Sequence, residues 1–268
     1  MTPDRLAPDG REVAVIGLGR SGVAATRLLL RSGRAVYASD AGSFPALEEL
    51  ARGLRVLGAA VDLGGHDLVR IGNAGLCVVS PGVPPDAPPL AAARRAGVPV
   101  QAEAELGLEA LDGIPYIAVT GTNGKTTTTA LVAHLLASTG CRVEAAGNIG
   151  TALSEIALEP MPPEWLSVEL SSFQLHDMRS VEPDVGVLTN LAPDHLDRYA
   201  TLDEYYQDKR RLFQRASADS IWVTNADDPA SQEVVRGVPG RQLRFSVGGR
   251  SDGWYDRDAG LLMFGSEV

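Results

Sequence analysis

The sequence predicts an α/β protein with two successive domains, each built on a largely parallel sheet. Three observations support this prediction: short continuous apolar runs, glycine-rich turns directly after several of them, and stretches of helical length in between. Continuous apolar runs are typical of strands that are buried on both faces, and the intervening stretches then form the crossover helices.

The N-terminal elements follow this alternation. Val13–Ile16 is predicted to be the first strand, Gly17–Gly22 a turn, and the following residues to Leu30 a helix. The remaining elements of this part are strands at 35–39 and 76–79, a proline-rich loop at 81–89 and a helix at 90–96.

A second strand–helix series begins near Ile114, after an Asp-Gly-Ile-Pro sequence that breaks the pattern. We therefore predict domains at 1–112 and 113–268. The strand Tyr116–Thr120 leads into a glycine-rich loop and a helix at Lys125–Ser138. The further elements are strands at 165–170, 185–190, 221–224 and 242–246, a helix at 202–215 and a hairpin at 254–264.

Composition limits the classes of function. A formal net charge of −10 argues against a nucleic-acid partner, because phosphate backbones need clustered basic residues. The first thirty residues lack the apolar core of a signal peptide, and no apolar run reaches the length of a membrane span. We expect a cytoplasmic, monomeric protein without a membrane partner. Cys77 and Cys141 have no metal-ligand spacing and are expected to be buried thiols.

Lysine is nearly absent from the chain. Of 24 basic residues only Lys125 and Lys209 are lysines, and the other 22 are arginines. The two lysines are therefore candidates for chemistry that a guanidinium cannot perform.

Thr120–Thr127 reads Thr-Gly-Thr-Asn-Gly-Lys-Thr-Thr and lies between a predicted strand and a predicted helix, which is the context of a P-loop. Its amides would bind the phosphates of ATP, Lys125 would reach the terminal phosphates, and the hydroxyl of Thr126 would ligate Mg²⁺. A strict P-loop has glycine at Val119, so this loop is a variant. The predicted cofactor-binding residues are Gly121, Thr122, Asn123, Gly124, Lys125, Thr126 and Thr127.

Gly17-x-Gly19-x-x-Gly22, with Asp40 at the end of the next strand, resembles a dinucleotide-binding turn of the Rossmann type. The turn could bind NAD, serve packing alone, or hold the pyrophosphate of another nucleotide. We favour the third interpretation, because a chain with a P-loop would rarely also need hydride chemistry.

Polar side chains follow two strands of the second domain. Glu169 and Gln174 follow one strand, and His195, which lies between Asp194 and Asp197, follows the next. Since α/β sheets bind ligands beyond the carboxyl ends of their strands, Glu169 is expected to assist Mg²⁺ and His195 to be functional.

Five motifs, at 121–126, 147–150, 169–174, 190–199 and 225–229, occur in the order seen in the Mur ligases. The chain resembles this family over essentially its whole length. Glu-Leu-Ser-Ser-Phe-Gln at 169–174, together with the N-terminal glycine turn and Ser80-Pro-Gly82, most resembles the members that add D-glutamate. The resemblance implies a Rossmann-like domain that binds UDP-N-acetylmuramoyl-L-alanine, a central domain that binds ATP, and ligation of D-glutamate through an acyl phosphate.

The resemblance also implies roles for single residues. Lys125, His195 and Lys209 would be catalytic, and Lys209 would be carbamylated. Two Mg²⁺ ions would be held with the help of Thr126, Glu169, His195 and Lys209. The substrate-binding residues would be Gly17, Gly19, Arg20, Ser21, Gly22, Asp40, Ser80, Asn148, Ser171 and Gln174.

The chain departs from the family pattern in two places. Ala41-Gly42 stands where the family often has polar or basic side chains near the uracil. The family's Gly-x-His-Asn-x-x-Asn segment and C-terminal domain are absent from these 268 residues, so we expect the chain alone to ligate negligibly. The alternatives are another Mur ligase, a ligase similar to folylpolyglutamate synthetase, and a non-catalytic nucleotide-binding module.

Overall fold

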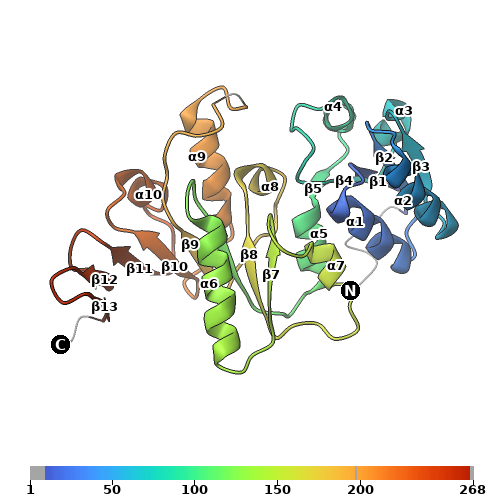
Figure 1. Cartoon of the computed structure of the whole chain (residues 1–268). Coiled ribbons are helices and arrows are strands. Elements are labelled where there is room, and N and C mark those ends of the chain that lie inside the picture. Colours follow the sequence, from blue (N-terminus) through green and yellow to red (C-terminus); the bar gives the residue numbers. More distant parts are fainter. Residues whose placement is uncertain (1–9, 197, 266–268) are drawn as a thin grey trace. The chain divides into compact units, whose positions relative to one another are not determined.

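The computed structural model describes residues 10–196 and 198–265, and the chain divides into two compact units (Figure 1). The first unit consists of Met1–Gly113 and Gly150–Pro162, and the second of Ile114–Ile149 and Pro163–Val268. The chain thus enters the second unit, returns to the first for a short segment, and then completes the second.

In its described residues, the first unit contains a parallel sheet with the strand order β3-β2-β1-β4-β5. Val13 and Val15 of the central strand β1 face one hydrophobic core, whereas Ala14 and Ile16 face another. Both faces of this strand are buried, which explains its uninterrupted apolar sequence. The strands are β1 (Val13–Ile16), β2 (Val36–Asp40), β3 (Ala60–Leu63), β4 (Leu76–Val79) and β5 (Val100–Ala102).

Helices cover both faces of this sheet. The core on one face includes side chains of α1 (Arg20–Arg31), α2 (Pro45–Val56) and α5 (Glu103–Ala110). The core on the other face includes side chains of α3 (Leu68–Gly72) and α4 (Pro88–Arg95). Cys77 is buried in this second core, as expected, whereas Cys141 is only partly buried; neither forms a disulfide.

The returning segment packs against α5. It contains α7 (Leu153–Ile156), and a Cβ atom added to Gly107 of α5 would lie 2.4 Å from the Cβ of Leu153. The buried carboxylate of Glu103 accepts a hydrogen bond from the backbone nitrogen of Ser154 at 2.8 Å. Close helix contact and a buried hydrogen bond therefore hold this segment in the first unit.

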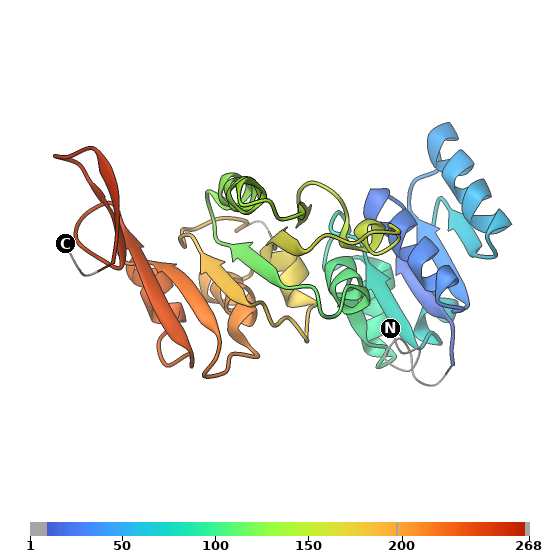
Figure 2. The same ribbon diagram turned by 90° about the horizontal axis from the view of Figure 1, so that it is seen from below.

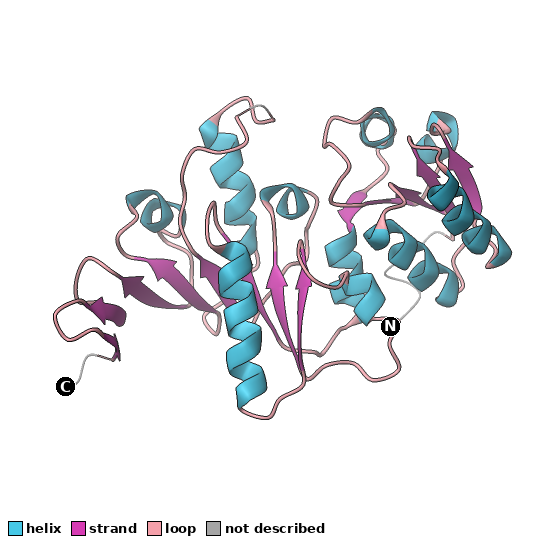
Figure 3. Cartoon of the chain, viewed as in Figure 1, coloured by secondary structure: helices cyan, strands magenta, loops and turns pink. Residues whose placement is uncertain are grey.

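The second unit contains a larger sheet with the order β13-β12-β11-β10-β9-β6-β8-β7 (Figure 3). Its neighbouring strands are parallel, except for the antiparallel pair β12 and β13. The strands are β6 (Tyr116–Thr120), β7 (Val143–Gly147), β8 (Trp165–Glu169), β9 (Val185–Leu188), β10 (Ile221–Asn225), β11 (Arg241–Ser246), β12 (Gly253–Asp256) and β13 (Leu261–Phe264).

The strand order determines which face of the sheet each helix of the second unit covers. The chain moves along the sheet in one direction from β6 to β7 and in the opposite direction in its later crossovers. Because such crossovers are right-handed, α6 (Lys125–Ser138) covers one face, while the later helices cover the other (Figure 2). These later helices are α8 (Ser172–His176), α9 (Leu202–Arg210) and α10 (Pro229–Val234).

The predicted α/β class and most predicted strands are confirmed. The predicted helix at 202–215 is too long, because α9 ends at Arg210 and a 3-10 turn covers Arg211–Phe213. The sequence prediction missed two helices of ordinary length, α2 with twelve residues and α5 with eight. It also missed the shorter elements β3, β5, β7, α3, α7, α8 and α10. The shorter elements have six residues or fewer and carry too little periodicity to be recognised.

The contact between α5 and the returning segment predicts opposite effects for two helical glycines. Gly107→Ala is expected to lower the free energy of unfolding by about 1–3 kcal/mol, because the added methyl group overpacks Leu153. Gly53 in α2 has open space where a Cβ would lie. Gly53→Ala is therefore expected to raise the free energy of unfolding by about 1 kcal/mol, because alanine has a higher helix propensity than glycine. Urea unfolding followed by circular dichroism measures both, and shifts in the same direction would contradict the packing described.

Candidate nucleotide and phosphate site

The loop between β6 and α6 has the backbone of a phosphate-binding loop. Gly121 has a φ of 144°, and a Cβ atom there would lie 2.0 Å from Oγ1 of Thr189. Gly124 has a φ of 81° and is the N-cap of α6. Both positions therefore require glycine, one for space and both for backbone conformation.

The end of β9 braces this loop. The carbonyl oxygen of Asn190 accepts a hydrogen bond from the backbone nitrogen of Thr122 at 2.8 Å, and its side-chain oxygen accepts one from Asn123 at 3.0 Å. Thr189 donates its hydroxyl proton to the carbonyl of Asn123 at 2.7 Å. Sequence reasoning assigned these two residues no role. The available signal was their position at the end of a strand that neighbours the P-loop strand.

Thr126 and Glu169 meet beside the loop. Oγ1 of Thr126 donates to Oε2 of Glu169 at 2.8 Å, and the amide of Asn148 donates to the other carboxylate oxygen at 2.8 Å. Glu169 is 1% exposed. Both donors are neutral groups, so neither of these two hydrogen bonds forms an ion pair with the carboxylate.

This arrangement fits a divalent cation such as Mg²⁺, which prefers hydroxyl and carboxylate oxygens. The described residues contain no group of three or more His, Cys, Asp or Glu side chains that could hold a metal. A metal here would therefore need phosphate oxygens or water among its ligands, as is usual for Mg²⁺ in nucleotide sites.

The chain's two lysines, at the start of α6 and in α9, both donate hydrogen bonds to carbonyls of this loop. Nζ of Lys125 donates to the carbonyl of Thr122 at 2.8 Å, and Nζ of Lys209 donates to the carbonyl of Gly121 at 2.8 Å. Lys209 is 1% exposed, and its amine lies 4.7 Å from the centre of the Tyr205 ring. Burial, and secondly the positive charge of Lys125, lower the pKa of Lys209 to about 7.

His195 lies in the loop after β9. Among the residues that the structure describes, His195 is the one non-glycine residue with a positive φ, which is 53°. Its ring packs 5.1 Å from Phe173 and 6.0 Å from Tyr205, so Tyr205 contacts both His195 and Lys209. Strained backbone of this kind persists where surrounding contacts hold it, and it clusters at functional sites. Asp197, the other predicted neighbour of His195, lies outside the described residues.

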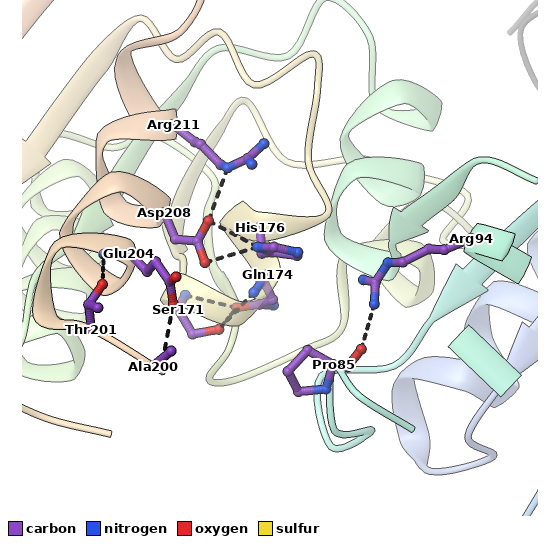
Figure 4. Close-up of polar contacts among 10 residues, drawn as sticks. All are labelled: Pro85, Arg94, Ser171, Gln174, His176, Ala200, Thr201, Glu204, Asp208 and Arg211. Atoms are coloured by element: carbon purple, nitrogen blue, oxygen red, sulfur yellow. Dashed lines mark hydrogen bonds and ion pairs between the residues drawn. The ribbon is translucent and has the colours of Figure 1, made fainter. Parts of the chain in front are cut away.

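Ser171 and Gln174 form a capping box at the start of α8. Oγ of Ser171 accepts from the nitrogen of Gln174 at 3.2 Å, and Oε1 of Gln174 accepts from the nitrogen of Ser171 at 2.9 Å (Figure 4). Nε2 of Gln174 is buried and has no hydrogen-bond partner among the residues that the structure describes. An unsatisfied buried donor is unfavourable by about 1–3 kcal/mol, which favours a ligand acceptor at this point.

The predicted N-terminal residues come together in the first unit. Gly17 has a φ of 87°, and a Cβ atom at Gly22 would lie 1.8 Å from the carbonyl oxygen of Gly17. The hydroxyl of Ser80 donates to the same oxygen at 2.8 Å. Asp40 accepts from the backbone nitrogen of Leu18 at 2.6 Å. Asp40 and Ser80 therefore hold the turn in shape.

The other residues of the turn differ in their surroundings. Gly19 precedes α1 and faces open space. Arg20 is largely exposed and forms an ion pair with Glu155 of the returning segment at 2.8 Å. Ser21 is half-buried, and Thr127, at the far end of the P-loop, is exposed.

A glycine turn on one parallel sheet, and a braced P-loop with a buried carboxylate and lysine on another, define a P-loop α/β protein. The sequence matches the family model of the Mur ligase middle domain over residues 119–262 and that of the Mur ligase MurD-like, N-terminal domain over residues 11–102. The chain therefore belongs to the Mur ligase family.

Two relatives extend this assignment. A UDP-N-acetylmuramoylalanine–D-glutamate ligase of Frankia casuarinae is 44% identical over 239 residues, which are 89% of this chain and 50% of the relative. The ligase of the same name from Microcystis aeruginosa is 40% identical over 267 residues, 96% of this chain and 58% of the relative. The predicted resemblance to D-glutamate-adding ligases is thus confirmed, and the chain spans about half the length of these relatives.

Solved structures support the fold. A murein peptide ligase from Psychrobacter arcticus superposes with a TM-score of 0.58 at 18% identity, covering 96% of this chain and 59% of that one. A Neisseria ligase for UDP-N-acetylmuramate and a peptide superposes with a TM-score of 0.57 at 19% identity, covering 88% of this chain and 78% of that one.

Among the described residues, no helix is long and apolar enough to span a membrane.

The lowered pKa of Lys209 predicts a pH-dependent contribution to stability. Between about pH 7 and 10.5 the unfolded chain keeps a proton that the folded chain has released, so stability rises with pH in this range. Lys209→Met removes this contribution. The Tm of the variant relative to the wild type is expected to fall steadily from about pH 6.5 to about pH 9.5 in CO₂-free buffer. A difference in Tm that is constant with pH would contradict a buried, pKa-shifted amine.

Proposed function

We propose that this chain forms the precursor-binding and ATP-binding parts of a ligase that adds D-glutamate to UDP-N-acetylmuramoyl-L-alanine in peptidoglycan synthesis. The observation that carries the proposal is that the chain's two lysines donate to successive carbonyls of one P-loop, beside a buried Glu169. The names of the relatives supply the substrate.

The second unit would bind ATP. The amides of residues 121–127 and the start of α6 would hold the phosphates, and Lys125 would leave the carbonyl of Thr122 to reach them. Thr126 and Glu169 would hold Mg²⁺, whose charge offsets the negative charge of the phosphates during transfer. His195 would serve a second metal site.

The first unit would bind the UDP part of the precursor. Its glycine turn presents the amides before α1, and Asp40 and Ser80 keep that turn in shape. We propose that Gly17, Gly19, Arg20, Ser21 and Gly22 contact the diphosphate and its surroundings. Asn148, Ser171 and the buried amide of Gln174 would contact the muramoyl-alanine part. In this proposal the predicted domain at 1–112 serves the UDP part of the precursor, and the predicted domain at 113–268 serves ATP and the muramoyl-alanine part.

The chemistry follows from the poor electrophilicity of a carboxylate. The L-alanyl carboxylate would attack the γ-phosphorus of ATP, and ADP would leave. The amine of D-glutamate would then attack the acyl carbon, lose a proton and displace phosphate. Lys125 would offset the negative charge that develops on the transferred phosphoryl group.

Lys209 has the properties of a carbamylation site. Its lowered pKa makes the neutral amine available near pH 7 to 8. The amine would attack the carbon of CO₂, a C–N bond would form, and loss of a proton would leave a carbamate anion. Arginine cannot react in this way, which gives a reason for one of the two retained lysines. The monomeric state and the cytoplasmic location stay predictions.

Calorimetry tests the proposal with three ligands. The chain is expected to bind UDP-N-acetylmuramoyl-L-alanine and ATP–Mg²⁺ with measurable heat and to show none with NAD⁺. Binding of NAD⁺ without binding of the UDP precursor would refute the proposal and favour an oxidoreductase.

A matched pair of variants controls the ATP measurement. Thr126→Val removes the hydroxyl beside Glu169, whereas Thr128→Val makes the same chemical change one half-turn further along α6. Thr126→Val is expected to abolish the effect of Mg²⁺ on ATP affinity, and Thr128→Val to preserve it. Equal effects of the two substitutions would exclude the proposed role of Thr126.

A further inference from the structure

Asp208, the residue before Lys209, is held between the side chains of His176 and Arg211. Nδ1 of His176 lies 3.0 Å from each carboxylate oxygen, and Nε of Arg211 lies 3.1 Å from Oδ1 (Figure 4). The side chain of Asp208 is 8% exposed, whereas those of His176 and Arg211 are each 40% exposed. We name these three residues the Asp208 clamp.

The clamp joins two elements of the candidate site. His176 is the last residue of α8, whose first turn carries the capping box of Ser171 and Gln174. Asp208 lies in the last turn of α9, and Arg211 opens the 3-10 turn that follows. The clamp therefore fixes the end of α9 to the helix that presents the buried amide of Gln174.

Asp208 and Lys209 hold different faces of α9. Successive side chains of an α-helix point about 100° apart, so the two residues anchor the helix in two directions. Asp208 anchors it to α8, and Lys209 anchors it to the P-loop carbonyl of Gly121. At its N-terminus, α9 is capped by Thr201, whose hydroxyl accepts a hydrogen bond from the nitrogen of Glu204. Rotation or sliding of α9 would therefore strain the bonds of Asp208 to α8 or the buried bond of Lys209 to Gly121.

We propose that the Asp208 clamp is a positioning device, which holds the amine of Lys209 at the P-loop in register with Gln174. The proposal rests on the proposed function, in which both residues serve the same reaction. Loss of His176 leaves a buried carboxylate with one partner fewer, and such a group is stabilised by moving toward water. The end of α9 would move with it, and Lys209 would lose its fixed place.

Competitive labelling of the two lysines with acetic anhydride tests the position of Lys209. The labelling rate is followed from about pH 7 to about pH 10, and its plateau at high pH reports access to the amine rather than its pKa. Lys125 is the internal reference. His176→Ala removes the clamp bond, while His176→Asn keeps an amide donor near the position of Nδ1. Arg215→Gln is the control, because it removes an exposed ion pair with Glu182.

His176→Ala is expected to raise the plateau rate of Lys209 by about tenfold, the effect of losing one charged hydrogen bond. His176→Asn and Arg215→Gln are expected to stay near the wild type, and Lys125 to be unchanged throughout. An unchanged Lys209 rate in His176→Ala would overturn the proposal. An equal rise in the labelling rates of both lysines would also overturn the proposal, because it would indicate destabilisation of the whole domain rather than displacement of Lys209.

ATP–Mg²⁺ affinity supplies the functional readout. It is expected to fall in His176→Ala and to recover in His176→Asn. Exposure of Lys209 without any loss of affinity would overturn the link between the clamp and the site. If the wild type itself binds no ATP–Mg²⁺, the proposed function fails, and the labelling still decides whether the clamp positions Lys209.

Discussion

The burial of the Lys209 amine against the P-loop is the contact on which the rest of the site depends. Lys209 is 1% exposed, and the bond of its amine to the carbonyl of Gly121 ties α9 to the loop between β6 and α6. Burying a primary amine is unfavourable while it carries a charge, and its pKa falls to about 7 as a result. The same contact that organises the loop therefore prepares the amine for chemistry that a solvated lysine performs poorly near neutral pH.

Much of the fold was predictable because its strands are short, apolar and buried on both faces. Val13–Ile16, Leu76–Val79 and Tyr116–Thr120 have the predicted bounds, and α6 begins at Lys125 as the P-loop pattern requires. The terminal hairpin also formed where the sequence predicted it, as β12 and β13. Local sequence determines these elements, so local reasoning finds them.

The contacts that a single strand or loop does not determine were not predictable. The return of Gly150–Pro162 to the first unit depends on Gly107 and Glu103, some fifty residues earlier in the chain. Thr189 and Asn190 brace a loop that precedes them by more than sixty residues. Asp208 stood in the sequence only as a neighbour of Lys209, and its pairing with His176 required the structure. Sequence patterns indicated which segments carry the candidate site residues, whereas the contacts that position these residues depend on packing between segments far apart in the chain.

The central claim is that Lys209 is kept for its amine, and ¹³C NMR with ¹³C-bicarbonate tests it most directly. With two lysines in the chain, a lysine carbamate resonance is assigned by substitution, and the carbamate of the N-terminal amine is recognised because all variants share it. The account predicts one side-chain carbamate signal in the wild type and in Lys125→Arg, and its loss in Lys209→Arg. A lysine carbamate signal that survives Lys209→Arg, or a wild type without one at saturating bicarbonate, would contradict it.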